Sequence, residues 1–143
     1  MNATITQQAT HSDSVPSAAM RTGSVSGIPL TLLRLEGAAA LAGASVAYSA
    51  LGGGWAKFAL LFLLPDLSML GYLAGRRVGA ACYNSAHSYL GPAVLAATGW
   101  TSSTHALLIA ASIWAAHIGF DRLLGYGLKY GTSFGDTHLS QPR

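Results

Sequence analysis

Four apolar segments, each close to twenty residues long, constrain this chain more than any other feature. They run over residues 29–51, 55–74, 78–98 and 103–124. A helix needs about 20 residues to cross about 30 Å of hydrocarbon. The breaks between the segments are short, so neighbouring helices would form antiparallel hairpins. The pattern predicts an all-α fold, an integral membrane bundle of about four transmembrane helices.

The composition agrees with a membrane protein and argues against other classes. Charged residues make up 9% of the chain and hydrophobic residues 51%, whereas an ordinary soluble domain has about 25% charged residues. The net charge is +3, but no basic run is longer than Arg76-Arg77, and nucleic-acid binding needs clustered positive charge. The single cysteine, Cys82, excludes an intrachain disulfide. We therefore expect the lipid bilayer, and not nucleic acid, as a partner.

The two ends of the chain differ from its middle. Residues 1–27 are polar and lack the apolar run of a signal peptide, which predicts a disordered polar leader. Residues 28–126 are predicted as the transmembrane domain, and 127–143 as a C-terminal tail. Basic residues near the segments concentrate on one side of the predicted bundle, with only Lys57 on the other. This bias predicts a cell (inner or plasma) membrane protein with both termini cytoplasmic, N-in and C-in. The concentrated residues are Arg21, Arg76, Arg77, Arg122, Lys129 and Arg143.

Ionisable residues gather in the cytoplasmic half of the predicted bundle. At about 1.5 Å per residue, Asp66, His87 and His117 lie about 12, 15 and 10 Å from the inner face. Asp121 lies one helical turn after His117, and Glu36 also falls in the inner half. A charged side chain at the bilayer centre costs at least about 2.5–3.5 kcal/mol. The outer half has almost no such residues, so the asymmetry predicts one shared polar site.

Histidines and carboxylates at similar depth form a mixed nitrogen and oxygen ligand set. Such ligands suit a divalent metal such as zinc, or manganese or iron. Asp136 and His138 would reach the site only if the tail folds under the bundle, and a solvated tail is the alternative. The predicted catalytic and metal-ligating residues are Asp66, His87, His117 and Asp121, with His138 as a further metal ligand. The predicted supporting residues are Glu36, Tyr83, Asn84 and Asp136.

Three functions fit these residues, so the sequence leaves open whether the chain is an enzyme. The first is a metal-dependent membrane hydrolase acting on a lipid or amphiphile. The second is a proton-coupled transporter or channel subunit that uses the same residues as a relay. Four short spans are few for a solute pathway, so transport would require a homo-oligomer. The third is a non-catalytic membrane protein whose polar groups hold helices together.

Several motifs together carry a family resemblance. They are PDLSMLGY at 65–72, YNSAH at 83–87, HIGFDRLLGYGLKY at 117–130 and DTHL at 136–139. In combination they resemble a family of small, mostly bacterial membrane proteins catalogued as domain of unknown function 4260, over about residues 30–140. The resemblance implies a multi-pass membrane protein and no particular activity. The same motifs contain the polar positions selected above by depth.

Overall fold

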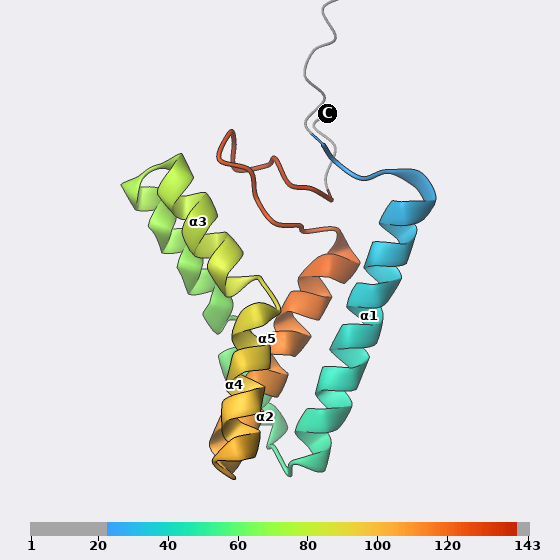
Figure 1. Cartoon of the computed structure of the whole chain (residues 1–143), viewed down its shortest axis with the longest axis vertical. Helices are drawn as coiled ribbons and strands as arrows, with labels where there is room; N and C mark the ends of the chain where they lie inside the picture. Colours follow the sequence, from blue (N-terminus) through green and yellow to red (C-terminus); the bar gives the residue numbers. More distant parts are fainter. Residues whose placement is uncertain (1–22, 140–143) are drawn as a thin grey trace, which may run out of the picture.

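The computed structural model describes residues 23–139, and most of the predicted leader lies outside them. Within this range the chain is helical and forms no strand, apart from an isolated bridge between Lys129 and Thr137 in the tail. Helix α5 lies in the middle, with α1 and α4 packed against it (Figure 1). The all-helical prediction is confirmed. The elements are α1 (Gly27–Ala50), α2 (Trp55–Phe62), η1 (Leu64–Ala74), α3 (Arg76–Ala86), α4 (Leu90–Thr101) and α5 (His105–Leu124).

Within residues 23–139, three helices are long and apolar enough to cross a membrane. They are Gly27–Ala50, the combined α2 and η1 over Trp55–Ala74, and His105–Leu124. Their outward faces carry large apolar side chains, and Leu60 and Leu73 are 78% and 88% exposed. Large exposed apolar surface of this kind suits contact with lipid rather than water. The three helices therefore indicate a membrane protein.

The predicted segment 78–98 is not one helix. It divides at residues 87–89 into α3 and α4, which have 11 and 12 residues, and each is too short to cross a bilayer alone. Pro92 explains the division, because a proline inside a helix has no N–H to donate and clashes with the carbonyl four residues earlier, here that of Ser88. Within the first turn of a new helix the missing N–H has no cost. A new helix therefore begins at Leu90.

The segment 55–74 also changes from one type of helix to another partway along. Helix α2 ends at Phe62, and η1 continues as a 3₁₀ helix of 11 residues. Pro65 disfavours a regular α-helix here because it cannot bond to the carbonyl of Leu61. Runs of 3₁₀ helix longer than a few residues are uncommon and often mark a functional segment. Asp66 lies in the first turn of η1, directly after this change.

The described ends of the chain and the turn between η1 and α3 lie at one end of the molecule (Figure 1). The turns after α1 and after α4 lie at the opposite end. Four segments therefore run between two ends, one of them being α3 followed by α4. The basic pair Arg76-Arg77 shares its end with the tail.

Two glycines allow α1 and α5 to approach closely. A Cβ added to Gly37 would lie 2.7 Å from the backbone nitrogen of Leu123. A Cβ added to Gly119 would lie 2.6 Å from that of Leu41. These clashes are with backbone atoms, so the helices could not accommodate a methyl group without separating. Arg34 adds a hydrogen bond of 2.8 Å from its Nε to the carbonyl of Leu123.

We predict that Gly37→Ala destabilises the protein by about 1–3 kcal/mol, the usual cost of overpacking. Gly43→Ala on the same helix is the matched control, because a Cβ there meets no atom within 4 Å. That control should be neutral or slightly stabilising, since alanine favours helix over glycine. Thermal unfolding in detergent micelles measures both variants. Equal melting temperatures would show that the α1–α5 contact does not depend on this glycine.

A candidate metal centre between the helices

The two histidines of the predicted site face each other at its centre. His87 directly follows α3, at the break before α4, and His117 lies on α5. Their Nε2 atoms are 3.1 Å apart. Both side chains are almost completely buried, with exposed fractions of 2% and 1%. The break after α3 thus places His87 against the continuous helix α5.

Two carboxylates complete the group. Asp66 Oδ1 lies 3.4 Å from His87 Nε2 and 3.5 Å from His117 Nε2. Asp121 Oδ2 lies 3.5 Å and 3.9 Å from the same two atoms. All four potential ligand atoms lie within 4.8 Å of one another. Ligand atoms around a tetrahedral ion with bonds of about 2.0–2.1 Å are about 3.3 Å apart, so this cage has the size of a transition-metal site.

The hydrogen bonding of His87 fixes which of its nitrogens is free. Its Nδ1 lies 2.9 Å from the carbonyl oxygen of Tyr83. A carbonyl can only accept, so Nδ1 carries the proton, and Nε2 of the neutral ring presents a lone pair. That lone pair points at the other imidazole and at two carboxylates. Two arrangements satisfy this contact: a metal ion bound between the two Nε2 atoms, or a proton on His117 Nε2 that is donated to His87 Nε2.

Tyr83 holds two members of the group at once. Its hydroxyl donates to Asp121 Oδ2 at 2.9 Å. Its ring stacks on the His87 ring, with centroids 3.7 Å apart and planes within 10° of parallel. Metal-binding histidines commonly donate their second ring N–H to a backbone carbonyl, and hydrogen bonds of this kind orient the ligands. Tyr83 provides both such contacts, one from its hydroxyl and one from its carbonyl.

The tail lies against the end of α3 next to the site (Figure 1). The Asn84 side chain donates to the carbonyl of Lys129 at 2.9 Å and accepts from the Lys129 N–H at 2.7 Å. The ammonium group of Lys129 donates to the carbonyl of Phe134 at 2.8 Å and lies over the rings of Phe134 and Tyr83. Burial lowers the pKa of Lys129. Asn84 therefore fixes the tail to the helix that carries Tyr83.

The structure does not bring the other predicted residues into the group. His138 lies in the tail, where its Nδ1 accepts the Leu128 N–H at 2.9 Å and its Nε2 lies 3.2 Å from Arg122. The Asp136 carboxylate accepts a hydrogen bond from Thr132 at 2.7 Å. Glu36 is exposed on α1. Glu36 was selected by its depth, and Asp136 and His138 by the expectation that the tail folds under the bundle.

Two residues near the site were not among the predicted site residues. Arg122 donates to the carbonyl of His87 at 3.3 Å, and Trp114 Nε1 donates to the carbonyl of Ala86 at 2.6 Å. The position of Arg122 directly after Asp121 in the sequence was the feature that could have indicated its place near the site. Both residues satisfy carbonyls that the break after α3 leaves free.

We predict that the docking of the tail weakens below about pH 6.5. Burial and the positive charge of Arg122 lower the pKa of His138 below its ordinary value of 6.5. The undocked tail therefore binds the proton more readily, so docking is fully stable above pH 6.5 and is lost as the pH falls through the lower pKa of the docked state. Protonation also removes the acceptor of the Leu128 N–H.

Hydrogen exchange of the tail amides, corrected for the intrinsic rate, tests this prediction at pH 8 and pH 5.5. The variant His138→Asn cannot titrate and should lose most of the pH dependence. Equal tail protection at both pH values in the natural protein would contradict the account.

Together, the apolar helices and the buried group define a membrane protein with a cluster of two histidines and two aspartates. The chain belongs to the family described as Domain of unknown function (DUF4260), whose sequence profile matches residues 30–141. The expected resemblance is thus confirmed, and the match contains all four residues of the cluster. Comparisons with curated proteins and with solved structures returned no match.

Proposed function

We propose that the cluster of Asp66, His87, His117 and Asp121 binds a divalent transition metal, with zinc as the first candidate. We further propose that the protein is a metal-dependent membrane hydrolase acting on a lipid or amphiphile. The observation that carries this proposal is the convergence of two imidazole nitrogens and two carboxylate oxygens at the spacing of a tetrahedral ligand set. Nitrogen and oxygen ligands of this kind are typical of catalytic zinc sites.

Three of the four residues are suited to be permanent ligands. His87 and Asp121 are both oriented by Tyr83. His117 packs edge-on against Phe62, with ring centroids 5.2 Å apart. Asp66 is the most exposed of the four, with 35% of its side chain accessible compared with 13% for Asp121. Asp66 is therefore the ligand that water can replace.

This division gives each residue a role in ester hydrolysis. His87, His117 and Asp121 would hold the ion, and zinc with three protein ligands would supply a water whose pKa is lowered to about 7. Asp66 would take a proton from this water, whose oxygen then adds to the carbonyl or phosphoryl centre of the substrate. The bond to the leaving oxygen then breaks, and Asp66 returns the proton to that oxygen. The products are an acid and an alcohol.

We also propose that the chain crosses the membrane four times with both termini cytoplasmic. In this topology α3 and α4 form one discontinuous crossing segment, interrupted at His87. Irregular backbone at membrane depth is tolerated where it is buried in protein, and such interruptions often form binding sites. The basic residues Arg76, Arg77 and Lys129 support this orientation under the positive-inside rule.

A proton relay is the second candidate, and one observation favours it. The separation of 3.1 Å between the two histidine Nε2 atoms is also a hydrogen-bonding distance, so a proton on His117 Nε2 would pass to His87 along this bond. A proton-coupled transporter or channel subunit would use the cluster in this way. The two candidates differ in whether purified protein holds a metal.

We predict that the protein purified in detergent binds about one zinc ion per chain, measured by elemental mass spectrometry after removal of free metal. His117→Ala should lose the ion because it removes one of the two buried nitrogen ligands. His105→Ala is the matched control, since His105 is an exposed residue at the start of the same helix. Absence of metal from the natural protein, or equal metal content in both variants, would contradict the metal centre.

We also predict that Tyr83→Phe lowers zinc affinity about 10- to 100-fold, the usual cost of removing a hydrogen bond that orients a ligand. The ring that stacks on His87 remains, so the fold should be preserved. Tyr126→Phe, at a residue that is 57% exposed, is the control and should bind as the natural protein does. Competition with a chromophoric chelator measures the affinities, and an unchanged Tyr83→Phe affinity would show that Asp121 needs no such support.

A further inference from the structure

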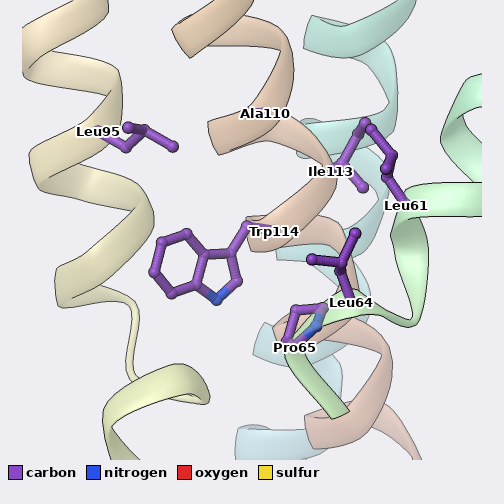
Figure 2. Close-up of a pocket in the computed structure, with 7 residues that line it drawn as sticks. All are labelled: Leu61, Leu64, Pro65, Leu95, Ala110, Ile113 and Trp114. Carbon is purple, nitrogen blue, oxygen red and sulfur yellow. The ribbon is translucent and has the colours of Figure 1, made fainter. Parts of the chain in front are cut away.

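An apolar cavity of about 260 Å³ lies next to the cluster. Figure 2 shows its walls, which come from α2, η1, α4 and α5. Leu61, Leu64 and Pro65 line it from α2 and η1, and Leu95 lines it from α4. Helix α5 contributes Ala110, Ile113 and Trp114. The indole of Trp114 projects into the space between α4 and Pro65 (Figure 2).

The cavity and the cluster are built from the same stretches of chain. Pro65 precedes Asp66 directly, and Ile113 lies one helical turn before His117. Trp114 also hydrogen-bonds the carbonyl of Ala86, the residue before His87. One turn of α-helix rises about 5.4 Å. The cavity therefore begins about one turn from the cluster, on the side away from the tail and the basic residues.

The lining of the cavity selects a hydrocarbon ligand. All seven lining residues are apolar in side chain except for the indole N–H of Trp114, which is already bonded to Ala86. A polar group placed there would lose its hydration without gaining a partner. Leu64 at the rim is 52% exposed, on a segment whose outer face suits lipid. A hydrocarbon chain can therefore enter from the side, out of the bilayer.

We propose that this cavity is the acyl-chain subsite of the enzyme. The part of this inference that concerns catalysis rests on the proposed hydrolase function. A single acyl chain lies in the cavity, with its ester group beside Asp66 and its polar end toward the tail. The volume is below the 300–1,000 Å³ of typical ligand pockets, so it accepts part of one chain and excludes a second. The substrate class is accordingly an ester with at least one fatty acyl chain.

A photoreactive fatty acid tests the subsite without requiring turnover. Palmitate carrying a diazirine in mid-chain is incubated with the full-length protein in lipid nanodiscs and irradiated, and the labelled peptides are identified by mass spectrometry. We expect label in 61–65 and 110–114, and at least a tenfold reduction by excess unlabelled palmitate. Ala110→Phe fills the cavity and should reduce the label at these positions by a similar factor.

Leu60→Phe is the matched control, because Leu60 lies on the exposed surface of α2, and it should label as the natural protein does. If Ala110→Phe fails to fold, Leu95→Trp fills the cavity from α4 and should have the same effect. Two results would overturn the proposal. One is label spread evenly over exposed leucines such as Leu60 and Leu73, and the other is label in the cavity that neither Ala110→Phe nor Leu95→Trp reduces.

The same experiment on zinc-loaded and chelator-treated protein separates this inference from the proposed function. Saturable labelling of the cavity in a protein that binds no metal would support the acyl subsite and refute the hydrolase. Metal binding without labelling of the cavity would refute the subsite and leave the metal centre intact. Labelling in both forms of a protein that binds zinc supports both.

Discussion

The structure depends on the contact between two imidazole nitrogens that both face carboxylates. Because Nδ1 of His87 donates to the carbonyl of Tyr83, its Nε2 meets His117 as a lone pair. Asp66 and Asp121 add negative charge on the same point. Polar and charged groups are costly among apolar helices unless each has a partner. A divalent ion would pair with all four residues at once, which is the strongest physical argument for a metal centre.

The interruptions of the helices, which Pro65 and Pro92 cause, position the residues of this group. A regular helix keeps its carbonyls bonded within itself, whereas the end of α3 releases several of them. Trp114 donates to the carbonyl of Ala86 and Arg122 to that of His87, whereas the carbonyl of Tyr83 accepts both the backbone N–H and the Nδ1–H of His87. Side chains of the site and its surroundings thus bond the carbonyls that are left free where the chain breaks and His87 turns toward α5. The change from α2 to η1 places Asp66 opposite it.

Much of this site could be predicted from the sequence, because depth in a bilayer follows from counting residues. Counting residues from the inner face placed Asp66, His87, His117 and Asp121 in the same half of the bilayer. The structure brings these four residues together. Depth does not tell which faces of separate helices meet, so Glu36 was included although it is exposed on α1. His138 was included because the tail was expected to fold under the bundle, but its imidazole contacts Leu128 and Arg122 instead. The division at residues 87–89 was missed because the length of the segment 78–98 fits a single span, although Pro92 was a visible signal. The close contact at Gly37 and Gly119 depends on how α1 and α5 cross, which cannot be read from the pattern of either helix alone.

X-ray absorption at the zinc edge of the metal-loaded protein tests the central claim most directly. The account predicts nitrogen and oxygen neighbours at about 2.0–2.1 Å, with the outer scattering of two imidazoles and none from sulfur. His87→Ala should retain the signal of one imidazole or lose the metal. A shell of oxygen neighbours without imidazole, or a sulfur neighbour contributed by Cys82, would contradict the account.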